Sequence, residues 1–323
     1  MAPSRLLGAA GVAAACAALV QRKARIPWKP AGRFVEAGGT RLHYVEAGEG
    51  TPLVLLHGLG SMVEDFIVSG LVAEAARRYR VVAFDRPGYG HSERPQDRRW
   101  TPAEQAQVLL EAMRALDVHR PVILGHSWGT MVAIEMALAA PGVPRSLVLA
   151  SGLYFPSARF DAPALAPPGI PLVGALLRHT VSPVAGRLLW PLWLRMLFAP
   201  APVPPALAAL AWKALRPSVL RTVGEETLQV LPVTLAAMQK YRDLTLPVVL
   251  VTGARDLYVS SRGHTARLHS MLVSAKLLVA PRGGHMVHHA DLPLVLDAID
   301  RAAWGAVEGS TAAGKFLSGS TRT

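Results

Sequence analysis

The sequence predicts an α/β protein with a mostly parallel central sheet, helices on both faces, and a helical segment inserted between two strands. Short apolar runs alternate with amphipathic stretches from residue 52 to residue 150, a rhythm typical of parallel sheets covered by helices. The rhythm stops after Gly152, where residues 153–246, rich in Pro, Leu, Ala and Trp, indicate several short helices. It resumes with an apolar run at 247–252, so the middle of the chain is an insertion.

The composition indicates a globular protein. The 323 residues are 51% hydrophobic and 17% charged, which is ample for a buried core. The formal charge of +12 would suit an anionic partner, but the basic residues, mostly Arg, are scattered along the chain and form no nucleic-acid-binding motif. We therefore expect no nucleic-acid partner. The single cysteine, Cys16, excludes an intrachain disulfide.

The N-terminal segment, residues 1–26, contains an uninterrupted apolar run at 6–20. Basic residues flank the run, namely Arg5 before it and Arg22, Lys23 and Arg25 after it. Its length matches the core of a signal peptide and falls short of the roughly 20 residues that usually span a bilayer. Because the heavier positive charge follows the run, the pattern favours a membrane anchor or transmembrane helix, with the rest of the chain in the cytoplasm. Two alternatives stay open: export after signal cleavage, and an N-terminal helix packed on the domain.

A hairpin and a buried strand are expected next. Short alternating runs at 33–36 and 41–47 flank Gly38-Gly39, a pair that favours a tight hairpin turn. The continuous apolar run 52–56 predicts a strand buried on both faces. It ends in His57-Gly58-Leu59-Gly60, whose glycines let the backbone turn its amides toward whatever lies above the sheet.

The alternation of helices and strands continues over residues 71–116. Residues 71–78 are expected to be helical, 80–84 to form a buried strand, and the Pro- and Gly-rich residues 85–92 to form a loop. Thr101, followed three residues later by a glutamate, is a capping box that begins an amphipathic helix over 102–116.

Residues 122–133 carry the motif around which the chain is organised. They begin as an apolar strand, pass through Gly125-His126-Ser127-Trp128-Gly129, and leave as an Ala-rich helix that runs to residue 140. A serine at the tip of so tight a turn has a strained backbone, and its hydroxyl stands clear of the sheet. Gly125 and Gly129 have to be small because the strand and the helix pass close together there. Ser127 is therefore the candidate nucleophile.

The remaining elements complete the predicted organisation. Within the insertion we expect helices at 207–215 and 225–230, and after it strands at 247–252 and 276–280 and a closing helix at 292–307. The predicted boundaries are an apolar segment at 1–26, the α/β domain at 27–152 and 247–308, the helical insertion at 153–246, and a disordered tail at 309–323.

Candidate partners for Ser127 follow the two late strands. Asp256 comes shortly after the strand 247–252, and His285 follows the strand 276–280. Because open α/β sheets place their sites at the carboxyl ends of the strands, we expect these three side chains to meet. His285 would take the proton of the serine, and Asp256 would orient the imidazole and stabilise its charge.

Other acids and histidines compete for these roles. Asp291 lies beyond the histidine and Asp161 lies in the insertion, so Asp256 is favoured as the acid. Only His285 follows directly from a Gly-Gly turn at the end of a strand. The histidines expected to hold loops or to line the following helix are His57, His126, His288 and His289. We expect no metal site, since the sequence around His285 offers no third ligand.

Five separated motifs together make the chain resemble the α/β-hydrolase superfamily, in its esterase- and lipase-like serine branch with a helical cap. They are His57-Gly58-Leu59-Gly60, the 85–92 loop, the Ser127 turn, the residues from Gly253 to Asp256, and Gly284-His285. The resemblance covers residues 33–307 and implies the α/β-hydrolase fold with residues 153–246 as the cap. It also implies that the backbone amides of Leu59 and Trp128 form an oxyanion hole. No cofactor is expected.

The nucleophile decides which chemistry the resemblance implies. Epoxide hydrolases and haloalkane dehalogenases are similar capped enzymes, but they carry an aspartate where this chain has Ser127. A serine with an oxyanion hole suits attack on a carbonyl, so we expect a serine hydrolase that cleaves a carboxylic ester of a small apolar substrate through an acyl-enzyme. The insertion residues Trp190, Trp193, Met196 and Trp212 either form the core of the cap or line the substrate pocket.

Several alternatives stay open beside ester hydrolysis. The same constellation suits a lactone, a thioester, an amide or the carbon–carbon bond of a meta-cleavage-type diketone, and it suits cofactor-free perhydrolysis of a carboxylic acid. A non-catalytic binding protein on the same fold is the alternative from a different class.

Overall fold

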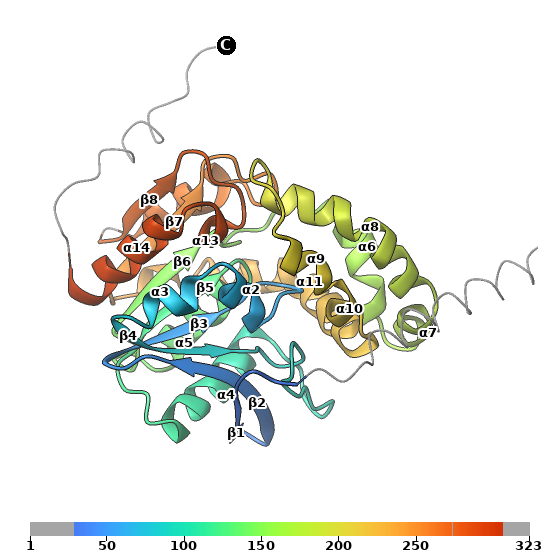
Figure 1. The fold of residues 1–323 in the computed structure, drawn as a ribbon, viewed down its shortest axis with the longest axis horizontal. Helices are drawn as coiled ribbons and strands as arrows, with labels where there is room; N and C mark the ends of the chain where they lie inside the picture. Colours follow the sequence, from blue (N-terminus) through green and yellow to red (C-terminus); the bar gives the residue numbers. More distant parts are fainter. Residues whose placement is uncertain (1–28, 273, 306–323) are drawn as a thin grey trace, which may run out of the picture.

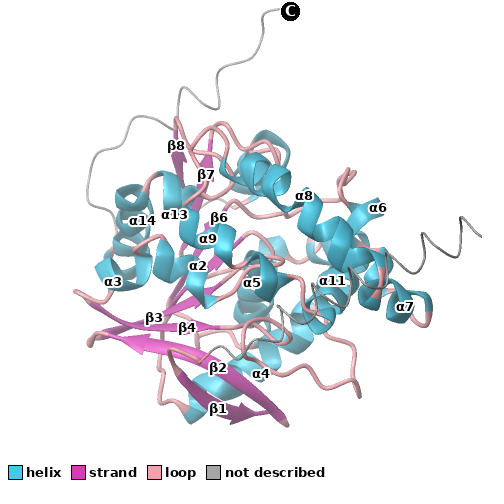
Figure 2. Ribbon diagram, turned by 45° about the vertical axis from the view of Figure 1, so that its right-hand side comes forward, coloured by secondary structure: helices cyan, strands magenta, loops and turns pink. Residues whose placement is uncertain are grey.

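The computed structural model describes residues 29–272 and 274–305, which contain one eight-stranded sheet (Figure 1 and Figure 2). The strand order is β1-β2-β4-β3-β5-β6-β7-β8. The strands are β1 (Arg33–Ala37), β2 (Thr40–Ala47), β3 (Thr51–Leu56), β4 (Tyr79–Phe84), β5 (Val122–His126), β6 (Ser146–Ala150), β7 (Val248–Gly253) and β8 (Lys276–Ala280).

The pairing of the strands confirms the predicted, mostly parallel sheet. β1 and β2 form an antiparallel hairpin, and β2 pairs antiparallel with β4. Every other pairing, from β4 across to β8, is parallel. β3 lies between β4 and β5, so the direction in which the sheet grows reverses there. In open α/β sheets, ligands bind outside the carboxyl ends of the strands at such a reversal.

Alternate side chains of each central strand point to opposite faces and divide the core in two. Leu53 and Leu55 of β3 pack with α3 (Leu71–Ala75) and α14 (Leu292–Trp304). Val54 and Leu56 pack on the other face with α4 (Pro102–Ala115) and α5 (Gly129–Ala139). All four side chains are fully buried, which explains why this strand reads as a continuous apolar run.

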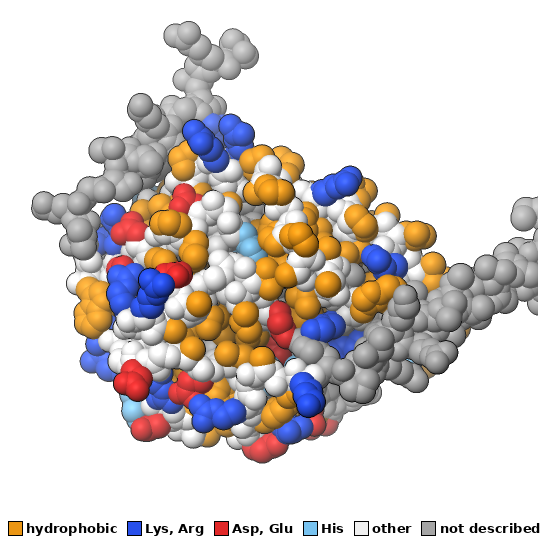
Figure 3. All heavy atoms as spheres, viewed as in Figure 1, with side chains coloured by type: hydrophobic (Ala, Val, Ile, Leu, Met, Phe, Trp, Pro, Cys, Tyr) orange, Lys and Arg blue, Asp and Glu red, His pale blue; other side chains and the backbone are white. Residues whose placement is uncertain are grey.

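The predicted helical insertion is confirmed, and it lies to one side of the sheet in Figure 1. Its helical elements are α6 (Ala162–Leu165), η1 (Pro167–Gly169), α7 (Val173–His179), α8 (Val181–Phe198), α9 (Pro205–Ala209), α10 (Ala211–Ala214), α11 (Pro217–Ala237) and η2 (Tyr241–Asp243). α11 is much longer than the predicted helix at 225–230, and its Val230 and Ala237 join the core on the α4–α5 face. Hydrophobic side chains also crowd the outside of the cap, with Lys and Arg scattered among them (Figure 3).

The helical segments that were not predicted include α2 (Val63–Val68), and η3 (Arg262–Ala266), which continues into α12 (Arg267–Met271). The side chain of the residue that precedes α2 makes no capping hydrogen bond. Instead, Oδ1 of Asp85 accepts the backbone N–H of Val63 at 2.9 Å. Because this cap comes from the end of another strand, the local sequence carries no signal for the start of the helix.

The prediction of a membrane-associated protein with a transmembrane helix is corrected. Among residues 29–272 and 274–305, no helix is long and apolar enough to cross a bilayer. Residues 1–26, on which that prediction and the signal-peptide alternative rested, lie outside the described residues, and so does the predicted tail at 309–323.

Four buried histidines are held in the neutral form. His57 accepts the backbone N–H of Arg86 at 3.0 Å, and His264 accepts two backbone N–H groups, at 3.1 and 3.2 Å. A protonated ring nitrogen could accept neither bond. Burial lowers the pKa of His57 and of His264 to about 4. Burial also lowers the pKa of His126 and of His288.

We predict that the free energy of unfolding falls as the pH drops from 7 to 5. Unfolded histidines take up a proton near pH 6.5, so each histidine that stays neutral in the folded state removes about 2 kcal/mol over this range. Glu64 acts in the opposite direction, because burial raises its pKa to about 7 and the folded state then takes up a proton that the unfolded state does not. Chemical denaturation at the two pH values measures the balance. An equal or higher stability at pH 5 would contradict it.

Candidate active site

Ser127 lies on the sharp turn between β5 and α5, where its φ angle is 51°. The positions two residues before and two residues after Ser127 leave no room for a side chain. A Cβ atom on Gly129 would lie 2.2 Å from the carbonyl oxygen of Leu56, and one on Gly125 would lie 2.5 Å from the carbonyl oxygen of Gly129. Close backbone packing of β3, β5 and α5 therefore holds the serine in a conformation that few residues other than glycine adopt.

The predicted residues Ser127, His285 and Asp256 converge at the carboxyl ends of β5, β8 and β7. Ser127 Oγ lies 3.0 Å from His285 Nε2, and His285 Nδ1 lies 2.9 Å from Asp256 Oδ2. The other oxygen, Asp256 Oδ1, accepts the backbone N–H groups of Tyr258 and Val259, both at 2.8 Å. Since Asp256 accepts the proton on Nδ1, the Nε2 atom is left to accept the proton of the serine.

The two rival acids are bound elsewhere. Asp161 accepts the hydroxyl of Tyr258 at 2.6 Å and Arg159 Nε at 2.9 Å. Asp291 accepts the backbone N–H of Leu294 at 3.2 Å as the N-cap of α14. Within the described residues, neither acid is hydrogen-bonded to His285.

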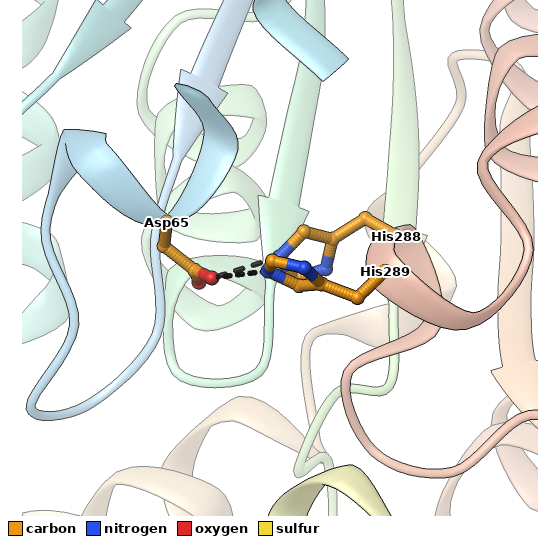
Figure 4. Close-up of side chains that lie close together, drawn as sticks. All are labelled: Asp65, His288 and His289. Atoms are coloured by element: carbon orange, nitrogen blue, oxygen red, sulfur yellow. Dashed lines mark hydrogen bonds and ion pairs between the residues drawn. The ribbon is translucent and has the colours of Figure 1, made fainter. Parts of the chain in front are cut away.

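Asp65 of α2 binds two histidines of α13 (Val287–Ala290) in a buried cluster (Figure 4). His289 Nε2 lies 2.7 Å from Asp65 Oδ1, and His288 Nε2 lies 3.3 Å from Asp65 Oδ2. Burial alone would raise the pKa of Asp65, but the two histidines hold it well below its usual value. Nothing in the sequence indicated that Asp65 would bind these two histidines.

The Asp65 cluster has the geometry of direct contacts between its side chains. Its ligand atoms lie within 4.8 Å of one another, a spacing that would also suit a cation. However, two atoms bound to one ion at about 2 Å each are normally about 3 Å or more apart. The 2.7 Å contact between Asp65 and His289 is instead a direct hydrogen bond. The cluster therefore joins α2 to the helix that follows His285.

His126 contacts the backbone of His285. Its Nε2 lies 3.1 Å from the carbonyl oxygen of His285. Because burial holds the pKa of His126 well below its usual value, the ring is neutral and donates its Nε2–H to that carbonyl. His57 has a similar supporting contact, since its Nδ1 donates to the carbonyl oxygen of Gly58 at 2.8 Å.

The loop after β3 lies against the nucleophile, since a Cβ atom on Gly58 would be 3.0 Å from Ser127 Cβ. In the part of the chain that the structure describes, the N–H groups of Leu59 and Trp128 donate no hydrogen bond to another protein group. Both are therefore available to a negatively charged oxygen at Ser127. Their assignment to an oxyanion hole stays a prediction.

A buried arginine binds the backbone of this loop, and it was not predicted from the sequence. Arg86 is the second residue after β4, and its side chain is fully buried. It binds the carbonyl oxygens of His57 and Gly58 and forms an ion pair with Glu226 of α11. The available signals were the Asp-Arg-Pro-Gly turn at residues 85–88 and the paired acids Glu225-Glu226 in an insertion with few acids.

A cavity opens above Ser127 between the α/β domain and the cap. Its lining is mostly apolar and includes Leu59, Met62, Trp190, Trp193, Leu194, Leu197, Phe198, Leu207, Leu210, Tyr258 and Met286. Two of the four aromatic and Met residues considered from the sequence, Trp190 and Trp193, thus line it. Among the described residues around the cavity there is no Lys or Arg, and the acid Asp65 is paired with histidines.

Comparison with known proteins places the chain in a family. Residues 53–298 match the model of the Alpha/beta hydrolase family. The chain is 25% identical over 286 residues to haloalkane dehalogenase 2 of Mycobacterium bovis (strain ATCC BAA-935 / AF2122/97), which covers 85% of this chain and 93% of that protein. It is 34% identical over 128 residues to the 2-hydroxymuconate semialdehyde hydrolase of Pseudomonas sp. (strain CF600), which covers 39% of this chain and 45% of that protein.

A solved structure gives the same result for the fold. The enol-lactonase from Burkholderia xenovorans LB400 superimposes with a TM-score of 0.68 at 19% identity, over 83% of this chain and 99% of that chain. The family match spans both parts of the α/β domain and the cap between them. The chain therefore belongs to the Alpha/beta hydrolase family.

Proposed function

We propose that this protein is a serine hydrolase that cleaves the carboxylic ester of a small apolar substrate. The observation that carries the proposal is Ser127 Oγ, hydrogen-bonded to His285 at the floor of an apolar cavity. Membership of a hydrolase family supports a hydrolytic reaction. The apolar lining favours a neutral substrate, because a buried anion without a cationic partner would be strongly destabilised.

In the proposed reaction, His285 Nε2 takes the proton of Ser127 as Oγ attacks the ester carbonyl carbon. The carbonyl oxygen becomes an oxyanion, which the N–H groups of Leu59 and Trp128 stabilise. Collapse of this intermediate breaks the bond to the alkoxy group, and the proton on His285 goes to the departing alcohol. Water then attacks the acyl-enzyme with the same general base, and the carboxylic acid leaves. Asp256 stays ionised throughout and stabilises the imidazolium.

The similarity to a haloalkane dehalogenase does not extend the proposal to dehalogenation. Attack of a carboxylate on a saturated carbon gives an alkyl ester, whose carbonyl carbon water can attack. Attack by Ser127 on the same carbon would give an ether, which has no carbonyl for water to attack. The serine at this position therefore favours carbonyl substrates.

Hydrolysis of a carbon–carbon bond is the second candidate, because one relative is named as a 2-hydroxymuconate semialdehyde hydrolase and is 34% identical over 128 residues. Such a substrate carries a carboxylate, and the described lining of the cavity offers it no Lys or Arg. Ester hydrolysis is therefore favoured, with lactones and thioesters as substrates that the same geometry would serve.

Substitution of the triad tests the mechanism. We predict that Ser127→Ala or His285→Ala lowers kcat by about 10⁴-fold or more, and that Asp256→Ala has a smaller effect, because members of such a unit fail together. Steady-state kinetics with a p-nitrophenyl ester measures the change, with circular dichroism to confirm folding. Turnover of Ser127→Ala close to that of the wild type would end the proposal.

The cavity lining predicts a preference for medium-chain or aromatic acyl groups over acetyl groups. Each methylene that leaves water adds about 0.8 kcal/mol, so kcat/KM should rise roughly fourfold per carbon until the cavity is full. A series of p-nitrophenyl esters, assayed beside lactones and a meta-cleavage-type diketone, measures the preference. Highest kcat/KM for an acetyl ester or for the anionic diketone would show that the cavity selects differently.

A further inference from the structure

Arg86 and Glu226 form a fully buried ion pair between the α/β domain and the cap. Arg86 Nη1 lies 2.6 Å from Glu226 Oε1, and Nη2 lies 3.1 Å from Oε2, so the contact is bidentate. Both side chains have no exposed surface. Tyr89 donates its hydroxyl to Oε2 at 2.7 Å, and Gln105 donates its amide to Oε1 at 2.9 Å. The carboxylate is thus held by donors on all sides.

The remaining donors of Arg86 reach the loop beside the nucleophile. Its Nε donates to the carbonyl oxygen of His57 at 2.8 Å, and Nη2 donates to that of Gly58 at 3.0 Å. Nη1 also donates to Gln105 at 2.8 Å. Together with the two bonds to Glu226, these contacts use all five N–H groups that a guanidinium offers. The side chain therefore has one orientation, which the cap helix α11 helps to set.

The carbonyl of Gly58 and the N–H of Leu59 belong to the same peptide unit. In a planar trans peptide these two groups point in opposite directions, so fixing the carbonyl also fixes the N–H. The Gly58 oxygen accepts hydrogen bonds from Arg86 Nη2 at 3.0 Å, from His57 Nδ1 at 2.8 Å and from the backbone N–H of Ser61 at 3.4 Å. If that carbonyl were released, the peptide could rotate. The carbonyl oxygen would then face the developing oxyanion in place of the N–H group, and it would repel the negative charge.

We propose that Arg86 and Glu226 are positioning residues for the oxyanion hole. Glu226 on the cap orients Arg86, and Arg86 holds the Gly58–Leu59 peptide so that the N–H of Leu59 faces the reacting carbonyl oxygen. The proposal rests on the proposed function, since it assigns Leu59 a role in the same reaction. It adds that the cap takes part in the chemical step through this pair, besides lining the cavity.

The test compares Glu226→Gln with Glu225→Gln in the full-length protein. In Glu226→Gln an amide NH2 group replaces one carboxylate oxygen, so that N–H donors face the donors of Arg86 and Tyr89. The bidentate ion pair is therefore lost, while the side-chain volume is kept. Glu225 is the matched control: it is the adjacent residue of α11 and binds Arg94 at 2.9 Å and Arg221 at 2.6 Å. Its hydrogen bonds to these two arginines do not reach the loop beside Ser127.

Two readouts separate positioning from mere stability. We expect Glu226→Gln to lower kcat by about tenfold or more with KM nearly unchanged, because an oxyanion donor acts in the transition state. A trifluoromethyl ketone with the preferred apolar chain forms an oxyanion on Ser127, so its inhibition constant should rise in proportion. The binding of the alcohol product, which has no oxyanion, should not change. Glu225→Gln should match the wild type in each measurement.

The outcomes are distinguishable. A Glu226→Gln variant that melts at a lower temperature but keeps wild-type kcat and wild-type affinity for the trifluoromethyl ketone would overturn the inference alone. A wild-type protein that neither turns over esters nor binds the ketone would overturn the proposed function and this inference with it. If Glu226→Gln does not fold, Tyr89→Phe removes one donor from the same carboxylate. That variant should also lower kcat with KM nearly unchanged, but by a smaller factor than Glu226→Gln. An unchanged kcat in it would overturn the inference.

Discussion

The close approach of backbone to backbone at the end of β5 is the constraint on which the rest of the site depends. Gly129 passes so near to the Leu56 carbonyl, and Gly125 so near to Gly129, that neither position can hold a Cβ atom without displacement of the chain. This packing forces Ser127 into a positive φ and aims its hydroxyl out of the sheet. Because β3, β7 and β8 end at the same edge, the loop at Gly58, Asp256 and His285 lie within reach of it.

Buried charge is the second organising feature, and it links the site to the rest of the molecule. The carboxylates of Asp65, Asp85 and Glu226 are buried. Burial alone would raise the pKa of each, but histidine or arginine partners and hydrogen bonds hold it below the usual value. A buried ion pair adds little stability over apolar residues of the same size, whereas loss of one partner typically costs about 3–5 kcal/mol. We therefore interpret these pairs as devices that fix geometry.

The sequence was enough to predict the elements that follow local rules. The central strands are apolar runs bounded by turn residues, and Ser127, Asp256 and His285 each follow such a strand, so their convergence at one edge of the sheet could be predicted. The pairs Arg86–Glu226 and Asp65–His289 could not, because their members lie 140 and 224 residues apart and carry no local pattern. The same applies to α2, whose cap comes from Asp85. Helix ends in the insertion were missed because packing against the core, and not the local sequence, extends α11.

The claim on which the account depends is that Ser127 is an activated nucleophile, and covalent labelling tests it most directly. A fluorophosphonate reacts with a serine only when a base removes its proton and an oxyanion hole receives the phosphoryl oxygen. Intact-mass spectrometry of the labelled protein, followed by peptide mapping, should show one adduct, located on Ser127, and Ser127→Ala should show none. An unlabelled wild-type protein, or equal labelling of Ser127→Ala, would contradict the account.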